Sequence, residues 1–355
     1  MKNLLPVNTR LCSSLFAFMA FALLMFTTGC NKVLDHLPDP TITTVATGLT
    51  NVIGVETDAK GNAWVAMYGT GVNDGKVAVV TPGGNVYDAI VNLSSIINPV
   101  SGENDGTAHM LLDGDTLFIT SAKFLYKANI SHFTPGDAPM DGALLPYEDV
   151  GAFSLSYPWV NNAHDSHIYG LCKGPEGDLY ITDAGANAVL HRKGCGNYAV
   201  LAEIPGYANP TAIGPPVVQG VPTGILFDGN DFLVTTLTGF PFLPGYASVY
   251  RISPSGALST YQDSLTTLVN IARGNRLGHL AVQYGTFGDF GFNHNTGALL
   301  WVNGNTATPL IEEMDQPVGI KQISLNSWYV TTQGDGKLLK ITYKPSFQAA
   351  EPDVK

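Results

Sequence analysis

The chain has 355 residues, of which 45% are apolar and 13% charged, a composition typical of a globular protein and not of a disordered one. Its 39 glycines and 22 prolines favour many short strands joined by turns. The net charge is −11, and residues 30–355 alone carry 16 basic against 29 acidic residues. Such an acidic chain repels phosphate backbones, which excludes nucleic acid as an expected partner.

The chain begins with the pattern of a secretory signal over residues 1–29. Lys2 and Arg10 precede an apolar run, and small residues follow it up to Gly29-Cys30. Gly29-Cys30 is the pair that a lipoprotein peptidase reads, so we expect Cys30 to be acylated and to hold the protein on a membrane. Thr27 stands where such signals usually have an aliphatic residue, which leaves an uncleaved membrane anchor or plain secretion as alternatives.

Residues 30–40 are expected to form a short tether, and residues 344–355 a C-terminal tail. Asn31 follows Cys30 in place of the Asp that retains some lipoproteins at the inner membrane. This favours a location in the cell envelope, either on the outer membrane facing the periplasm or at the cell surface.

Two cysteines remain in the exported part, Cys172 and Cys195. An oxidising compartment permits a disulfide between them. The alternative is two free thiols, because the repeat described next places another strand between the two residues.

One unit recurs six times along the chain: an apolar strand, a tight turn, and a strand with aromatic or branched residues. The central residues of these second strands are 53, 62, 53, 48 and 48 residues apart. The second strands are Trp64–Ala66, Leu117–Ile119, Leu179–Ile181, Phe232–Val234, Leu280–Val282 and Trp328–Val330. Third strands are expected at Gly75–Val80, Lys123–Ala128, Asn187–Arg192, Ala247–Ile252, Gly297–Val302 and Gly336–Ile341. Outer strands follow, for example at Tyr198–Ile204, Leu258–Asp263 and Thr308–Met314.

The sixth unit has no fourth strand of its own, and Thr41–Ala46 is a spare strand at the start. Pairing the two closes a ring and covers two open edges. We therefore predict an all-β fold, a six-bladed β-propeller over residues 41–343 whose N-terminal strand closes the last blade. The alternatives are a β-sandwich or two small β domains, which do not repeat a whole unit six times.

Loops between strands two and three, and between blades, share one face of such a ring. Nearly every long insertion falls there, and we call this the long-loop face. Ordered loops on a rigid scaffold commonly bind ligands, and Trp159, Phe240 and Phe242 are the candidate apolar platform. The alternative is that these rings pack loop against loop.

The central channel offers polar candidates. Glycine occupies one position of the innermost strands in four blades, whereas His109 and Asn270 take it in blades two and five. Other polar residues are expected at the mouth, with Asp105 and Asp165 beside them: Asn51, Glu103, Asn104, His164, His167 and Gln316. The cluster could hold Ca²⁺ or Zn²⁺. The alternative is an ordinary water-filled polar channel, since no ligand spacing here is diagnostic.

Three stretches carry a family resemblance: residues 182–190, residues 221–225, and residues 237–245 running on to Val249-Tyr250-Arg251. Together they resemble the ScyD/ScyE family, which is named for a cyanobacterial pigment cluster. The resemblance covers about residues 41–343 and is strongest in blades three and four. It implies a six-bladed propeller of the TolB-like or NHL-like kind in an exported setting, and it transfers no catalytic residue.

Three hypotheses of function follow. The first is a non-enzymatic module that binds a small molecule or a protein on the long-loop face. The second is a metal-dependent hydrolase or lyase of the gluconolactonase-like propeller type, which rests on fold analogy. The third is a scaffold of an envelope complex. No Gly-x-Ser-x-Gly elbow or other catalytic constellation can be assembled from spacing.

Overall fold

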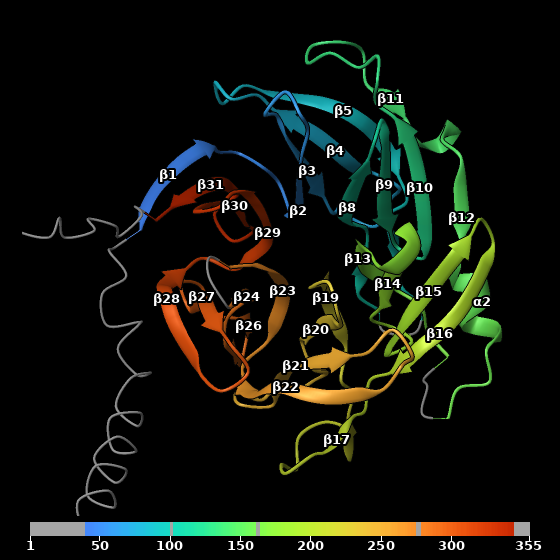
Figure 1. The fold of residues 1–355 in the computed structure, drawn as a ribbon, viewed down its shortest axis with the longest axis vertical. Coiled ribbons are helices and arrows are strands. Elements are labelled where there is room, and N and C mark those ends of the chain that lie inside the picture. Colours follow the sequence, from blue (N-terminus) through green and yellow to red (C-terminus); the bar gives the residue numbers. More distant parts are fainter. Residues whose placement is uncertain (1–39, 100–101, 161–163, 275–277, 344–355) are drawn as a thin grey trace, which may run out of the picture. The chain divides into compact units, whose positions relative to one another are not determined.

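The computed structural model describes residues 40–343, apart from 100–101, 161–163 and 275–277. The signal sequence, Cys30, most of the tether and the tail lie outside the described residues. The compact unit spans Thr41–Thr342. Its sheets radiate from a common axis and follow one another around a ring in chain order (Figure 1). This confirms the predicted all-β, six-bladed propeller.

Each blade is an antiparallel sheet whose strands run from the axis outward in sequence order. Blade 1 contains β2 (Val52–Thr57), β3 (Ala63–Met67), β4 (Gly75–Val80) and β5 (Val86–Leu93). Blade 2 contains β8 (Thr107–Asp113), β9 (Thr116–Ser121), β10 (Phe124–Asn129) and β12 (Tyr147–Asp149). Blade 3 contains β13 (Ile168–Lys173), β14 (Leu179–Asp183), β15 (Ala188–Gly194) and β16 (Asn197–Glu203).

The remaining blades follow the same plan. Blade 4 contains β19 (Pro222–Phe227), β20 (Phe232–Thr236), β21 (Ala247–Ile252) and β22 (Leu258–Leu265). Blade 5 contains β23 (Leu268–Arg273), β24 (His279–Gln283), β27 (Gly297–Val302) and β28 (Ala307–Met314). Blade 6 contains β29 (Pro317–Ser324), β30 (Ser327–Thr332), β31 (Lys337–Thr342) and, from the other end of the chain, β1 (Thr41–Ala46).

The ring closes through β1, as predicted. This strand pairs antiparallel with β31 in a register that sets Thr41 opposite Thr342 and Thr44 opposite Leu339. On the inside, each innermost strand contacts the innermost strands of the blades on either side, including β2 with β29. Both ends of the described ring are thereby paired, and the edge of β31 is covered.

The apolar core lies between neighbouring blades and not along the axis. One cluster joins Trp64 and Val79 of blade 1 to Leu117 and Ile119 of blade 2, and similar clusters join other adjacent blades. The second strands of blades 1 and 3 and the third strand of blade 1 are buried on both faces, which explains their nearly continuous apolar sequence.

Every innermost strand carries a register shift at the position where the sequence has Gly54, His109, Gly170, Gly224, Asn270 or Gly319. Neighbouring backbones approach closely there: a Cβ on Gly224 would lie 2.5 Å from the Cα of Asn270. Threonines on the second strands support the shift. Thr182 accepts a hydrogen bond from Gly170 N at 2.7 Å and donates to Thr223 O of the next blade at 2.5 Å.

Blade 2 departs from the repeat, and this explains its 62-residue spacing. Between β10 and β12 the chain forms β11 (Met140–Asp141), which adds to blade 1 parallel to β5, and the short 3-10 helix η1 (Gly142–Leu144). The α-helix α2 (Val150–Ser156) then leads toward blade 3, where a second 3-10 helix, η2 (Pro175–Gly177), forms the first turn. In the described residues no helix has the length and apolarity to span a membrane.

The candidate disulfide is not formed. Cys172 is buried on the innermost strand β13, whereas Cys195 is exposed in the turn between β15 and β16, and both are free thiols. The strand β14 lies between β13 and β15 in the sheet, so the alternative of two free thiols is the one that the structure has.

Candidate functional site

The mouth of the channel on the long-loop face is built from a six-fold repeated backbone contact. In each blade, the residue before the innermost strand accepts a hydrogen bond from the backbone N–H of the residue after strand two. The donor and acceptor pairs are Tyr68 and Asn51, Ala122 and Gly106, Ala184 and His167, Leu237 and Val221, Tyr284 and Thr267, and Gln333 and Gln316. The repeat therefore places polar side chains from blades 1, 3, 5 and 6 around one opening.

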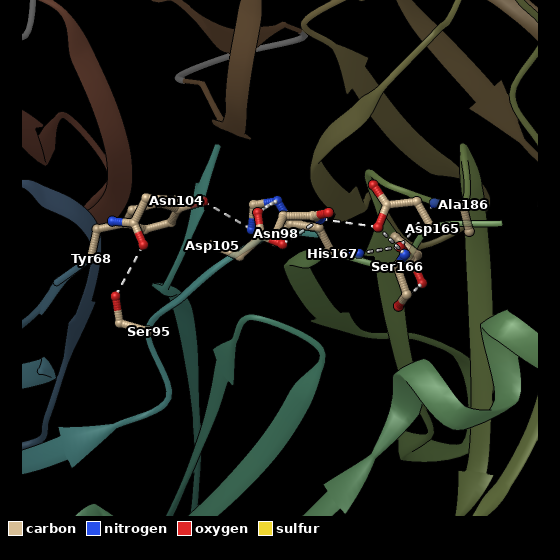
Figure 2. A network of polar contacts seen from close by, with 10 residues as sticks. Tyr68, Ser95, Asn98, Asn104, Asp105, Asp165, Ser166, His167 and Ala186 are labelled. Atoms are coloured by element: carbon tan, nitrogen blue, oxygen red, sulfur yellow. Dashed lines mark hydrogen bonds and ion pairs between the residues drawn. The ribbon is translucent and has the colours of Figure 1, made fainter. Parts of the chain in front are cut away.

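Tyr68, His167 and Asp105 form a polar relay across three blades (Figure 2). The Nδ1 of His167 lies 3.2 Å from the Oδ1 of Asp105, and its Nε2 lies 3.0 Å from the hydroxyl oxygen of Tyr68. Because a carboxylate only accepts hydrogen bonds, a proton on Nδ1 suits this contact. Nε2 then accepts from the Tyr68 hydroxyl.

Burial shifts the pKa values of two members of the relay, Asp105 and Tyr68. Burial raises the pKa of Asp105, while the neighbouring His167 and a hydrogen bond from Asn98 act in the opposite direction. Burial, with the charge of Asp105 nearby, raises the pKa of Tyr68 well above its usual value. Tyr68 is therefore a hydroxyl donor at neutral pH, and it does not serve as a phenolate.

His167 is positioned by Asp183, at the end of β14. The Oδ1 of Asp183 accepts from the backbone N–H of His167 at 2.9 Å, and its Oδ2 accepts from the hydroxyls of Ser154 and Ser166. Asp183 itself is fully buried. The loop that carries His167 is thus tied to the end of a rigid strand.

Amide side chains connect the remaining carboxylates and loops of this network (Figure 2). The Nδ2 of Asn98 donates to Asp105 at 2.7 Å and to Asp165 at 3.0 Å. Asn104 donates to Gly69 O and accepts from Ser95, and the exposed Asn51 approaches the same Gly69 O at 3.4 Å. These contacts fix the loops of blades 1 and 2 around the relay.

Gln316 lies on another side of the mouth, with Tyr284. The Tyr284 hydroxyl lies 3.2 Å from Gln316 Oε1 and 2.6 Å from Gln333 Oε1. Burial raises the pKa of Tyr284 to about 12, so this hydroxyl is also a donor. Tyr284 and Tyr169 are electrostatic neighbours, and Tyr169 packs edge-on against His167, with ring centroids 6.0 Å apart. The two polar groups are therefore continuous.

An aromatic cluster adjoins Tyr284. Phe242 lies 4.9 Å from Phe287 and 5.0 Å from Phe292 between ring centroids, and Phe292 lies 4.8 Å from Tyr284. Phe240 packs at the edge of the cluster, 6.0 Å from Phe287, and is 46% exposed. Two of the short hairpin strands on this face belong here, β25 (Phe287–Gly288) and β26 (Gly291–Phe292).

The other short pairs also belong to loops. They are β6 (Ile96–Ile97) with β7 (Asn104–Asp105), and β17 (Tyr207–Ala208) with β18 (Val217–Val218). The first pair carries Asn104 and Asp105 and so holds part of the relay in a fixed strand geometry.

Trp159, the third predicted platform residue, does not belong to the aromatic cluster. Its ring packs against Tyr157 at 4.5 Å and against the apolar cluster between blades 2 and 3, and its Nε1 donates to Ser154 O. Trp159 therefore packs loop against loop. His164 and Glu103 are both exposed at the mouth, and the charge of Glu103 acts on Tyr68.

His109 and Asn270 lie deeper in the channel than the other candidates. They line a cavity of about 340 Å³ with residues from all six innermost strands. Tyr169 connects this level to the mouth, because its ring packs edge-on against both His109 and His167, with centroids 4.7 and 6.0 Å apart. The sequence predicted one group of polar residues in the channel. The structure divides them between two levels, the mouth and the cavity.

The described residues contain no group of three or more His, Cys, Asp or Glu side chains arranged to hold a metal ion. The donor chemistry of the mouth agrees with this. Both ring nitrogens of His167 are engaged, and Asp105 and Asp165 share the amide of Asn98. A histidine ligates a metal through a nitrogen lone pair, and in this arrangement the Nε2 of His167 lies against the Tyr68 hydroxyl.

Sequence reasoning missed Tyr68, Asn98, Asp183 and Tyr284 as site residues. The available signal was the repeat itself, because Tyr68 and Tyr284 stand immediately after strand two in blades 1 and 5. Asp183 stands one residue earlier, at the end of strand two of blade 3. Comparing the position after strand two across the six units would have identified Tyr68 and Tyr284, but not Asp183 or Asn98.

No protein-family profile and no curated protein matches the sequence. Solved structures do match. A PQQ-bound aldose sugar dehydrogenase from Streptomyces coelicolor is 13% identical, with a TM-score of 0.56 over 87% of this chain and 100% of that one. A putative gluconolactonase is 12% identical, with a TM-score of 0.50 over 88% of this chain and 95% of that one.

A virginiamycin B lyase from Staphylococcus aureus is 15% identical, with a TM-score of 0.49 over 86% of this chain and 100% of that one. At such identities the likeness concerns the fold alone. The structural neighbours are propellers of the gluconolactonase and virginiamycin B lyase type, and the resemblance to the ScyD/ScyE family stays a prediction from sequence motifs.

Proposed function

We propose that this protein is a binding module whose long-loop face takes a small molecule with an apolar part and a hydrogen-bonding part. The observation that carries the proposal is the position of Tyr284. Its ring packs on Phe292 of the aromatic cluster, while its hydroxyl hydrogen-bonds with Gln316 and Gln333 of the polar mouth. Apolar surface and oriented donors thus meet at one residue.

Such a juxtaposition is the usual composition of a small-molecule site, in which aromatic surface supplies affinity and a few polar groups supply orientation. The cluster of Phe240, Phe242, Phe287 and Phe292 comes from loops of two blades, which the propeller holds at fixed positions. The relay of Tyr68, His167 and Asp105 adds a pre-oriented donor and acceptor set on the polar side.

The test is a thermal-shift screen of the purified protein with bicyclic aromatic fragments that bear one hydroxyl or amide group. Fragments that raise the melting temperature of the wild type should lose that effect when Phe240 and Phe242 are both replaced by Ala, because ligand binding stabilises by mass action. Phe290→Ala is the matched control, since Phe290 is an exposed ring on the neighbouring loop of blade 5 that joins none of the cluster contacts. Equal shifts in the double variant and the wild type would refute the placement.

A second candidate function is acid–base catalysis on the bound molecule, in a hydrolase or lyase. The relay favours it, because Tyr68 can donate a proton while His167, backed by Asp105, takes up or returns one. Replacing His167 by Gln should abolish turnover of any substrate without preventing its capture. Elemental analysis of unchelated protein tests the metal-dependent form of this hypothesis, and bound calcium or zinc in stoichiometric amounts would support it.

We further propose that the protein is exported and anchored to the cell envelope by a lipid on Cys30, on the outer membrane facing the periplasm or at the cell surface. The support is the sequence pattern ending in Gly29-Cys30. Cells expressing the protein should incorporate labelled palmitate into it, and Cys30→Ala should remove the label. Label that persists in the Cys30→Ala protein would overturn this proposal.

A further inference from the structure

The cavity lined by His109 and Asn270 is not explained by the long-loop face. Its volume is about 340 Å³, within the size range of small-molecule sites. The residues that line it come from the second halves of the six innermost strands, such as Arg273 at the end of β23 and Lys173 at the end of β13. The cavity therefore opens toward the short-turn face, opposite the long loops.

His109 lines one wall of this cavity. It is only 7% exposed, and its Nε2 is buried without a hydrogen-bond partner. Leaving such an atom unpaired is unfavourable, and a ligand hydroxyl that reached it would relieve this cost. Burial lowers the pKa of His109 to about 3, so the imidazole is neutral at pH 7 and offers a hydrogen bond in place of a charge.

The rim of the cavity is cationic. Lys321 pairs with Glu56 at 2.5 Å, and Lys173 pairs with Asp113 at 2.6 Å. Arg273 has no carboxylate within 4 Å among the described residues, and its Nη2 donates to the backbone oxygen of Phe227 at 2.8 Å. One guanidinium charge thus remains uncompensated at the opening, in a chain whose overall charge is −11.

The distance between the level of His109 and that of Arg273 sets the length of a ligand that contacts both. Arg273 stands three residues beyond Asn270 on β23, and Asn270 occupies the channel level of His109. At about 3.3 Å per strand residue the two levels are about 10 Å apart. The cavity wall has polar and apolar parts, and Val55, Ile225 and Ile320 are among its apolar residues.

We propose that this cavity binds a small, elongated organic monoanion, with its carboxylate at Arg273, an apolar middle, and a hydrogen-bonding group at the Nε2 of His109. The guanidinium fork suits a carboxylate. This site is independent of the long-loop face, so the two proposals stand or fall separately.

The test is isothermal titration calorimetry on the full mature protein with three probes of matched length: 8-hydroxyoctanoate, octanoate and 1,8-octanediol. The hydroxy acid should bind most tightly and the diol should not bind. Arg273→Gln should weaken both acids about tenfold or more, because it removes a charge-assisted pair. His109→Leu should weaken the hydroxy acid about tenfold and leave octanoate unchanged, since only the hydroxyl reaches Nε2.

Lys60→Gln is the matched control, because Lys60 is an exposed cation in a short turn on the same face and does not line the cavity. Its affinities should equal those of the wild type. Arg273 is exposed, so its variant reads out binding even if replacing the buried His109 prevents folding. Absence of binding by both acids at about 10 mM, which corresponds to a negligible affinity, or unchanged affinity in Arg273→Gln, would overturn the proposal.

Discussion

At the scale of single residues, the candidate sites depend on what surrounds each polar group. His167 has partners on both ring nitrogens and a backbone tied to Asp183. His109 has a ring nitrogen without any partner. The sequence places the two histidines at different positions of the repeat, but it does not show which of them has partners. Their difference arises from which side chains the other blades bring into contact.

His109 predicts a pH dependence of stability. Burial lowers its pKa in the folded state to about 3 from an unfolded value near 6.5, so the unfolded chain binds the extra proton as pH falls between these values. The stabilisation is complete above pH 6.5 and is lost on acidification, by about 1.4 kcal/mol per pH unit. Urea unfolding from pH 7 to pH 5 should show a shallower loss for His109→Gln than for the wild type. Parallel curves would contradict this assignment.

At the scale of elements, all six blades have the same kind of innermost strand, with a register shift at the same position. The glycines at this position were predicted from crowding at the axis, and the structure gives the reason as direct backbone approach between blades. Thr120, Thr182, Thr235 and Thr331 recur at one position of strand two, and three of them, Thr120, Thr182 and Thr331, donate to a backbone oxygen of the next blade, which was not predicted. The sequence pattern does not distinguish a threonine whose hydroxyl bonds to the next blade from any other threonine in a buried strand.

Replacing Gly224 by Ala should destabilise the protein. The new Cβ would lie 2.5 Å from the Cα of Asn270, and a backbone cannot yield as a flexible side chain does, so the expected cost is about 1–3 kcal/mol. Gly83→Ala is the control, because a Cβ there has no neighbour closer than 3.9 Å. Denaturant unfolding measures both, and equal midpoints for the two variants would count against the crowding argument.

Blades 2 and 3 are joined by a buried charge cluster around Glu148 on β12. Its carboxylate accepts from Arg192 at 2.6 Å, from Tyr198 at 2.5 Å and from the backbone N–H of Gly196, and it pairs with Lys127 at 2.5 Å. Burial by itself raises the pKa of Glu148, but these four partners together hold it well below its usual value.

Glu148→Gln should therefore cost about 3 kcal/mol at pH 7, because it leaves buried cations without their partner. The contribution is fully present above the unfolded pKa of about 4.5 and is lost as pH falls below it. The difference in unfolding free energy between wild type and variant should then shrink from pH 6 to pH 3. A difference that stays constant over that range would show that the charge of Glu148 is not responsible.

At the scale of the whole molecule, the six repeats and the closing strand were sufficient to predict the ring, its strand order and the face that bears the long loops. The site could be predicted only in part. Asn51, His167 and Gln316 do lie at one mouth, because the repeat dictates their positions. The separate packing of Trp159 and the lower level of His109 depend on contacts between loops and blades that are distant in sequence.

Ring closure predicts that β1 contributes to stability. Beginning the chain at Gly48 instead of Pro40 removes the strand that pairs with β31. Losing this set of backbone hydrogen bonds should lower the unfolding free energy by about 3 kcal/mol, and the bared edge should promote association. Unfolding and light scattering of the two chains measure these effects. A monomeric, equally stable shorter chain would show that β1 does not close the ring.

The claim that the long-loop face is the binding surface is tested most directly by hydrogen–deuterium exchange with and without a fragment found in the thermal-shift screen. The account predicts slower exchange in the loops at residues 236–246 and 284–296, which carry Phe242 and Tyr284, and no change in the short turns at residues 58–62 and 228–231. Protection confined to the short turns or to the outer strands would contradict it.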